Sequence, residues 1–520
     1  MKKYLLVLIS GLIFTSLTGQ ENRKSETVQT ITIEELRDHI YYLASDELEG
    51  RLPGTPGIEK AMEYAVTQFR QAGLIPFHLS SDSRLSYYQD LTVNKYLPHP
   101  DNQIKIIRNT GERTFTFEDN YIIGYDNNFE IREIAGGLAF IGYGIREPAY
   151  GIDEYKNIDV KGKWVVTLPY TEELPEYIRK KIPQGLLQKY QKSSLARLLN
   201  KLQNAFDAGA IGLIEVSTSS YTTDRWKRIA LSNRVHYNIP GLSNLDFGEK
   251  CPLVKLDSAM TDYLFNQEKY NPVRNKGSYK SFLFENAEFR LKKEYEILPI
   301  KTANVVALIE GSDPNLKNEY IALTAHIDHL GIDGNEIFNG ADDDASGCAS
   351  VFEISEALAK SKLRRSVICI LFTGEEFGLL GSYYFTENPP VTLKNIIVDV
   401  NIDMIGRPDT VPNEFSSVGA DRINPKLKEI INAVNKKTSD FILDTVNHNN
   451  DFMRGDQYTF HLKRIPSVMF TSLEHDDYHT PADDPEKIDY EFLQKSCQLI
   501  YEIILELANG DINLIDQGFN

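Results

Sequence analysis

Residues 320–347 read YIALTAHIDHLGIDGNEIFNGADDDASG and decide the fold of this chain. The first six of them, 320–325, are apolar enough for a strand that is buried on both faces. Acids and histidines follow at once, and a second polar segment, 340–347, then opens a helix. A buried strand that leads into a helix is typical of a parallel or mixed sheet covered on both faces.

Three more runs rich in Val, Ile, Leu or Phe predict further strands of the same sheet, at 366–372, 396–402 and 465–470. Ligands and catalytic groups collect at the carboxyl ends of parallel strands. The residues that follow these runs are almost all acids and histidines, among them Glu375, Glu376, Asp403 and His479. The sequence therefore predicts one polar site built from the ends of four strands.

Many carboxylates in one cleft are costly, because each ionised group resists desolvation and repels its neighbours. Divalent cations would compensate that charge. Two imidazoles with several carboxylates and no cysteine favour Zn²⁺, with Mn²⁺ and Co²⁺ as alternatives. Since the candidates outnumber the three protein ligands that one metal ion needs, we expect two ions that share a bridging carboxylate.

Five motifs, in this order, resemble those of di-zinc aminopeptidases, the bacterial leucyl aminopeptidase-like family in the clan that includes glutamate carboxypeptidase. They are His-x-Asp at 326–328, Gly-Ala-Asp-Asp-Asp-Ala-Ser-Gly at 340–347, Glu-Glu at 375–376, Asn-Ile-Asp-Met-Ile-Gly at 401–406 and Tyr-His-Thr-Pro at 478–481. The resemblance implies an α/β zinc-peptidase fold, with a mixed, largely parallel central sheet and helices on both faces.

The same resemblance implies two Zn²⁺ per chain. The ligands would be His326 and Asp403 for one ion, Glu376 and His479 for the other, and Asp343 as the bridge. Glu375 would be the general base, because a carboxylate beside an activated water can take its proton and pass it to the leaving amine.

Other residues are expected to support the site. Asp328 lies two residues after His326, on the same side of an extended chain, so its carboxylate should accept the second N–H of that imidazole and fix its tautomer. The resemblance gives Tyr478 the role of aiming its hydroxyl at the oxyanion. Arg454 and Asp456 would line the substrate side.

Several polar neighbours have a simpler interpretation. A histidine after a strand is more often an ordinary core or surface residue than a ligand, so we leave His329 outside the predicted site. His475 competes with His479, but only His479 precedes Thr-Pro. Asp342 and Asp344 are suited to cap the following helix. Charge does not choose among the three consecutive aspartates, and the choice of Asp343 rests on the resemblance.

The catalytic domain is expected to be discontinuous. A β-rich middle region, 111–288, separates a first peptidase part, 28–110, from a second part, 289–510, that carries the site. Segments 142–144, 155–163 and 205–212 resemble a protease-associated domain, a module inserted in many such peptidases. We expect this insert to gate the cleft or shape substrate access, with a plain spacer as the alternative.

Residues 46–51, DELEGR, resemble the opening segment of the same peptidases, where the first helices pack onto the catalytic sheet.

The cysteines indicate neither a disulfide framework nor a metal site. Four of them without CxxC spacing are too few for a disulfide framework, and we expect small buried side chains at Cys251, Cys348, Cys369 and Cys497.

Charge and the first residues bear on partners and location. The 520 residues carry a net charge of −18, which disfavours nucleic acid. Residues 1–19 have the layout of a secretory signal peptide. Their apolar run has about ten residues against the roughly 20 that a membrane span needs, which disfavours a membrane anchor. We expect export to the periplasm or outside the cell, without stable membrane insertion.

The sequence therefore predicts an exported di-zinc metallopeptidase that hydrolyses peptides, most consistent with an aminopeptidase. Three alternatives stay open. A glutaminyl cyclase has a similar sheet but usually holds one zinc, and a carboxypeptidase of the same clan would bind the other end of its substrate. A receptor-like binding protein on this fold would lack ligands, whereas all the candidate ligands are present here.

Overall fold

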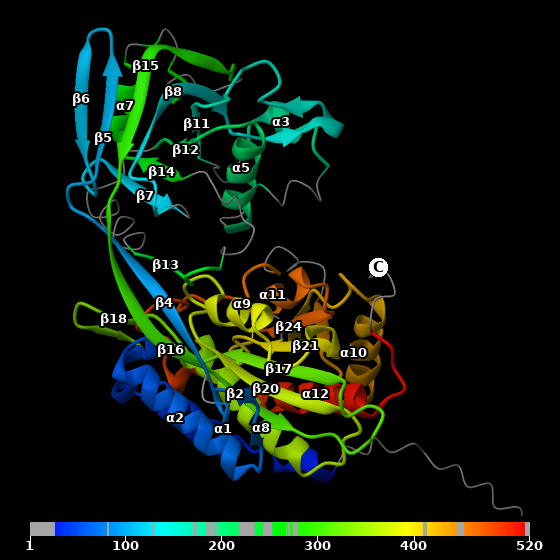
Figure 1. The fold of residues 1–520 in the computed structure, drawn as a ribbon. Coiled ribbons are helices and arrows are strands. Elements are labelled where there is room, and N and C mark those ends of the chain that lie inside the picture. Colours follow the sequence, from blue (N-terminus) through cyan, green and yellow to red (C-terminus); the bar gives the residue numbers. More distant parts are fainter. Residues whose placement is uncertain are drawn as a thin grey trace, which may run out of the picture.

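The computed structural model describes residues 26–80, 83–126, 129–169, 174–183, 190, 195–217, 235–242, 252–266, 268, 271–273, 279–408, 413–444 and 452–514. Within them, the chain forms two bodies around two sheets (Figure 1). The first contains the predicted site and keeps the name catalytic domain; the second is the insert. The predicted signal peptide and Cys251 lie outside the described residues.

The catalytic sheet has ten strands and is mixed, as predicted. Its order is β13 (His236–Asn238), β4 (Tyr88–Pro98), β16 (Tyr295–Ile309), β20 (Ser366–Phe372), β17 (Tyr320–His326), β21 (Ile396–Ile402), β24 (Ser467–Thr471), β22 (Glu414–Val418) and β23 (Ile442–Asp444), with β1 (Ile75–Pro76) beside β16. The four strands at its centre, β20, β17, β21 and β24, are parallel to one another. They are the four strands that the sequence predicts, although β24 begins at Ser467 rather than at 465.

Helices cover both faces of this sheet because its central strands are buried and largely apolar. In β20, Val367, Cys369 and Leu371 pack into one core cluster, whereas Ile368, Ile370 and Phe372 pack into another. Alternate side chains of a strand point to opposite faces. The sequence therefore fixes a three-layer α/β arrangement.

The helices divide between the two layers (Figure 1). On the lower face lie α1 (Ile33–Leu43), α2 (Pro56–Gln71), α8 (Gly347–Ala359) and α12 (Tyr490–Asn509), which contribute to the larger core cluster. On the upper face, Phe385 of α9 (Leu380–Glu387) and Phe460 of α11 (Gln457–Leu462) pack on Phe372. A further helix, α10 (Pro425–Thr438), contacts α12.

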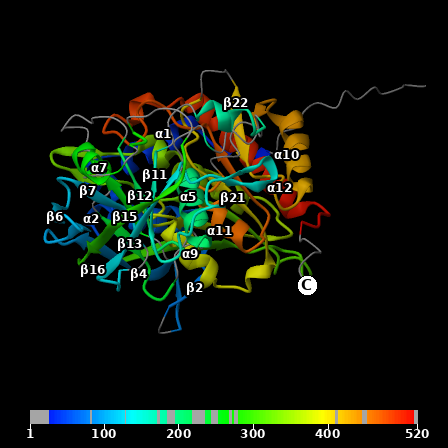
Figure 2. The ribbon, with the colours of Figure 1, turned by 90° about the horizontal axis from the view of Figure 1, so that it is seen from above.

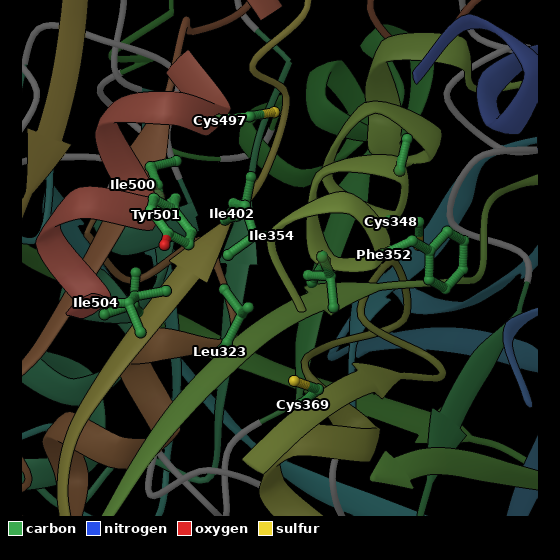
Figure 3. Close-up of a cluster of buried hydrophobic side chains, with 14 of the residues drawn as sticks. Leu323, Cys348, Phe352, Ile354, Cys369, Ile402, Cys497, Ile500, Tyr501 and Ile504 are labelled. Carbon is green, nitrogen blue, oxygen red and sulfur yellow. The ribbon is translucent and has the colours of Figure 1, made fainter. Parts of the chain in front are cut away.

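Figure 3 shows how α8 and α12 meet the sheet. Ile354 of α8 and Ile500 and Ile504 of α12 lie on the side of Leu323 of β17, whereas the ring of Phe352 points away from it and packs on His39 and Phe69. Cys348, Cys369 and Cys497 are free thiols buried in this cluster. The prediction that these three cysteines are small buried side chains is confirmed.

The insert forms an eight-stranded sheet of its own. Its order is β6 (Gly111–Thr116), β5 (Gln103–Arg108), β15 (Phe282–Lys292), β8 (Glu133–Gly142), β11 (Trp164–Thr167), β12 (Gly212–Glu215), β14 (Leu253–Leu256) and β7 (Tyr121–Tyr125). Helix α7 (Ser258–Phe265) packs on one face, and α5 (Leu195–Asp207) on the other. The short helix α3 (Glu176–Arg179) joins the α7 side through Ile178.

Pairing in this sheet moves the predicted domain boundaries. β5 pairs with both β6 and β15, so the insert begins at 103 rather than at 111. β15 continues to Lys292 and not to 288. The difference arises because the turn at 109–110 lies within a hairpin of the insert. A β-rich composition marks the interior of the insert but not its first strand.

The insert also contributes a strand to the catalytic sheet. β13 pairs antiparallel with β4, at the edge of the catalytic sheet. Tyr237 of β13 lies against Phe377, the residue after Glu376, with ring centroids 4.3 Å apart. Ile239 is buried beside Leu91 and Leu380 in the same cluster. Viewed from above, the insert lies over the catalytic domain (Figure 2), and this strand ties the two bodies together.

No helix among the residues that the structure describes is both long and apolar enough to span a membrane.

Replacement of Tyr237 by alanine tests the contact made by β13. Contact between two aromatic rings contributes about 0.5–1.5 kcal/mol. We therefore expect amide hydrogen exchange at β13 and β4 to become roughly 2- to 12-fold faster, with little change in β17, as measured by mass spectrometry. Tyr150→Ala, at an exposed tyrosine of the insert, is the matched control. Unchanged exchange at β4 in Tyr237→Ala would contradict the contact.

Candidate metal centre

The predicted site residues meet at the carboxyl ends of the four central parallel strands. His326 is the last residue of β17. Glu375 and Glu376 follow β20, Asp403 follows β21, and His479 lies in the segment after β24. Because the four strands run in the same direction, their ends lie at one edge of the sheet.

Asp343 is the centre of this group. It is 3% exposed, and its Oδ1 lies 3.2 Å from Nε2 of His326. Its Oδ2 lies 3.2 Å from Nε2 of His479. One carboxylate therefore presents a different oxygen to each of two imidazoles, which is the arrangement of a bridging ligand.

Two groups of metal-ligating atoms share Asp343. In the first, potential ligand atoms of His326, Asp343 and Asp403 lie within 4.8 Å of one another, with 3.7 Å between His326 Nε2 and Asp403 Oδ1. The second group is His329, Asp343 and Glu376. His479 belongs to neither group, but its Nε2 lies 2.9 Å from Oε2 of Glu376. The five predicted metal ligands are thus brought together.

The residues fit Zn²⁺ on two observations. Nε2 of His479 is buried and makes no hydrogen bond to any residue that the structure describes, although carboxylate oxygens surround it. In addition, the carboxylates of Asp343, Glu376 and Asp403 converge where little solvent reaches them. Imidazole nitrogens with carboxylate oxygens are a zinc-type donor set. Cations between these groups would remove their mutual repulsion.

The pKa values reflect this crowding. Burial, aided by Asp403 and Glu376, raises the pKa of Glu375 well above its ordinary value despite the nearby His326. Burial alone would raise the pKa of Asp343 too, but the surrounding imidazoles, led by His329, hold this pKa well below the ordinary value of an aspartate. The protonation of each carboxylate therefore depends on burial and on the charges of its neighbours.

His329 belongs to the site, contrary to the sequence interpretation. It is fully buried, and its Nδ1 lies 2.6 Å from Oε1 of Glu376 and 3.8 Å from Asp343 Oδ2. His329 and His479 therefore approach opposite oxygens of Glu376. The sequence indicated His329 only by its place in the segment His-x-Asp-His, directly after a buried strand. This pattern cannot distinguish a metal ligand from a residue that orients a metal ligand.

Asp328 supports the site through different atoms from those expected. Its backbone carbonyl, not its carboxylate, makes the 3.1 Å hydrogen bond with Nδ1 of His326. The carboxylate is 3.9 Å from that nitrogen and accepts the backbone N–H of Glu375 at 3.1 Å. The expectation was wrong because the chain turns after His326, where the strand ends. Asp328 thereby links the segment after β17 to the segment after β20.

The three consecutive aspartates have separate partners. Asp342 accepts the amide of Gly406, and Asp344 accepts the amides of His326, Met404 and Gly347, the last being the first residue of α8. Only Asp343 faces both metal-ligand groups. The expectation that a neighbour caps the helix while Asp343 bridges agrees with this geometry.

Asp483 is a support that the sequence did not reveal. Its carboxylate accepts the amides of Asp342 and Asp343, each at 3.1 Å. Burial, with the nearby Asp342, raises its pKa to about 6. His475 lies 3.4 Å from Asp342 rather than beside Glu376, so it does not compete with His479 for that carboxylate.

Tyr478, Arg454 and Asp456 lie near the site. The ring of Tyr478 stacks on His479, with centroids 3.8 Å apart, and its hydroxyl accepts a 3.1 Å hydrogen bond from Arg454. Burial raises the pKa of Tyr478 above its ordinary value, so its hydroxyl stays protonated. Asp456 is buried, and burial raises its pKa to about 7 while His326 lowers it.

Comparison with known proteins identifies the region that carries this site. Residues 304–504 match the model of Peptidase family M28. This part of the chain is similar to peptidase family M28. The M28 region contains all of the predicted ligands, whereas β4 and the opening helices of the same domain precede it.

Solved structures extend the likeness to the whole fold. An aminopeptidase from Aneurinibacillus sp. strain AM-1 has a TM-score of 0.56 and 19% identity, over 95% of this chain and 98% of that one. A zinc aminopeptidase from Bacillus subtilis has a TM-score of 0.50 and 18% identity, over 94% and 98%. At these identities the likeness shows the fold alone.

Relatives by sequence match shorter stretches. A probable leucine aminopeptidase 2 from Aspergillus oryzae is 38% identical over 109 residues, which are 21% of this chain and 20% of that protein. A probable zinc metalloprotease from Pyrenophora teres f. teres is 27% identical over 221 residues, 36% of this chain and 47% of that protein. The chain thus spans between a fifth and a half of the length of these relatives.

Alanine variants of the two histidines beside Glu376 distinguish ligand from support. We expect His479→Ala to lose one of two bound zinc ions, because its Nε2 has no other partner. His329→Ala should keep both ions with weaker binding at one, because its Nδ1 already bonds to Glu376. Zinc per chain is measured by elemental analysis after gel filtration, with His99→Ala, at an exposed histidine, as control. The reverse pattern would make His329 the ligand.

Proposed function

We propose that this chain is an exported di-zinc aminopeptidase. The observation that carries the proposal is the position of Asp343, whose two oxygens face His326 and His479 at equal distances of 3.2 Å. His326 and Asp403 would hold one zinc, Glu376 and His479 the other, and Asp343 both. A glutaminyl cyclase with one zinc is disfavoured, because it has no need of a bridging carboxylate.

Two bound zinc ions would polarise the scissile carbonyl and lower the pKa of the attacking water. Glu375 is the residue placed to move its proton. Its Oε2 lies 4.0 Å from His326 Nε2, so it borders the ligand group without occupying it. Its backbone N–H is fixed by Asp328. Glu375 takes a proton from the water and delivers it to the leaving amine.

Tyr478 and Arg454 act on the other side of the scissile bond. The hydroxyl of Tyr478 accepts its hydrogen bond from Arg454, which leaves the phenolic proton available as a donor. That donor would stabilise the oxyanion that develops on the carbonyl oxygen. Arg454 also pairs with Glu474, which limits its movement.

Preference for the amino end of the substrate is supported by the relatives that are leucine aminopeptidases. A crowded acidic centre also suits the positive charge of a free α-amino group better than a carboxylate. Export through residues 1–19 and a protease-associated role for the insert belong to the same proposal. The contact of Tyr237 with Phe377 supports an insert that acts on the cleft rather than a plain spacer.

Glu375→Gln tests the role of the base. We expect kcat to fall by about 10²- to 10⁴-fold, since the amide cannot accept the proton, while zinc content and the unfolding temperature stay close to the wild type. The assay is hydrolysis of leucine p-nitroanilide. Glu387→Gln, at an exposed glutamate of α9, is the matched control. Wild-type kcat in Glu375→Gln would remove this residue from the mechanism.

Blocked peptides test which end of the substrate is bound. We expect Leu-Gly-Gly to be hydrolysed at its first bond and N-acetyl-Leu-Gly-Gly to be resistant, with products read by mass spectrometry. A carboxyl-amidated peptide should be cleaved as readily as the free one. Release of the last residue from the acetylated peptide would instead indicate a carboxypeptidase.

A further inference from the structure

Arg51 is a buried arginine whose side chain, among the residues that the structure describes, has no carboxylate within hydrogen-bonding distance. It ends the short helix 46–51 and is 1% exposed. Its guanidinium donates to backbone carbonyls only: Ile327 at 2.9 Å, Leu43 at 2.6 Å, Asn339 at 2.6 Å, Gly340 at 3.0 Å and Asp343 at 3.4 Å. A full set of neutral acceptors around a buried cation is unusual, because such a cation is costly to bury.

These carbonyls have a common place in the fold. Ile327 directly follows His326, and the carbonyl of Arg51 itself accepts the N–H of His329 at 3.3 Å. Asn339 and Gly340 immediately precede the aspartates, and Asp343 is the bridge. Arg51 therefore ties together both ends of the loop that separates the first ligand from the bridging ligand.

The charge of Arg51 also suits its position. Burial lowers its pKa, while Cys348, Asp343 and Asp328 act in the opposite direction. The guanidinium thus lies within the field of the acidic centre, yet it bonds to none of the carboxylates that ligate. Its positive charge offsets the repulsion among the carboxylates and leaves the predicted metal ligands free to bind metal.

The backbone before Arg51 is shaped to deliver it. Glu49, Gly50 and Arg51 all have positive φ values, of 51°, 67° and 53°. A Cβ on Gly50 would lie 2.5 Å from the carbonyl oxygens of both Gly331 and Phe338. These two belong to the small hairpin of β18 (Gly331–Asp333) and β19 (Glu336–Phe338), within the same loop. The helix end and the loop therefore fit together in one arrangement.

We propose that Arg51 is a positioning residue that sets the zinc affinity of the centre by fixing His326 and Asp343 relative to each other before metal binds. This inference rests on the proposed function. Residues that orient metal ligands typically change metal affinity by 10- to 100-fold when they are lost. Arg51 acts on the backbone of the ligand loop rather than on the ligand side chains.

Arg365 is a matched control for a purely structural role. It is 3% exposed and also binds backbone carbonyls, those of Leu507, Gly510 and Ile512, besides Glu319. It precedes β20, at the opposite end of that strand from Glu375. Loss of Arg365 should therefore cost stability without reaching the metal centre.

The experiment measures zinc affinity by competition with a zinc-binding indicator for the full chain. We expect Arg51→Ala to bind zinc about 10- to 100-fold more weakly than the wild type, and Arg51→Lys to lie between them, since an ammonium has three donors and cannot reach all five carbonyls. Arg365→Ala should bind zinc as the wild type does, although its unfolding temperature falls. Circular dichroism establishes that each variant is folded.

Each outcome has one meaning. Wild-type zinc affinity in a folded Arg51→Ala, or an equal loss in Arg365→Ala, would overturn the positioning role. If Arg51→Ala does not fold, the same comparison is made with Arg51→Lys, whose wild-type affinity would overturn it equally. A wild-type chain that binds no zinc would instead overturn the proposed function, so the two failures are distinguishable.

Discussion

The structure depends on one electrostatic constraint, the repulsion among carboxylates that four parallel strands deliver to a single edge. Asp343, Glu376 and Asp403 lie so close together that desolvation and mutual repulsion would favour their dispersal. Two features of the fold hold them in place. The backbone amides of neighbouring loops bind the aspartates that are not predicted ligands, and imidazoles lie between the remaining carboxylates, with the buried guanidinium of Arg51 nearby.

The strands of the catalytic sheet place the predicted site residues, and the loops after the strands orient their side chains. Strands β17, β20, β21 and β24 are buried on both faces, so their place between two helical layers fixes where each strand ends. The side chains beyond those ends are then held by a web of contacts between loops, such as Asp328 with Glu375 and Asp483 with Asp343. The insert adds β13 to this arrangement and contacts, through Tyr237, the segment that carries Glu375.

Much of this organisation could be predicted from the sequence, because the strands are strongly apolar and the residues after them are chemically distinctive. The central strands and the convergence of the five ligands follow from that pattern. The finer contacts do not. A histidine after a buried strand, such as His329, looks the same in the sequence whether it binds a metal ion, orients a metal ligand or only fills the core. The hydrogen bond made by the backbone carbonyl of Asp328 cannot be predicted from residue type, because every residue has such a carbonyl. The edge of the insert was also missed, since β5 resembles the strands on either side of it. The carbonyls that Arg51 binds become neighbours only once the chain has folded.

Anomalous diffraction from crystals of the zinc-loaded protein, recorded on both sides of the zinc absorption edge, tests the central claim most directly. The account predicts two peaks, one on each side of the Asp343 carboxylate, separated by about 3.5–4 Å. A single peak, or two peaks that Asp343 does not separate, would contradict it.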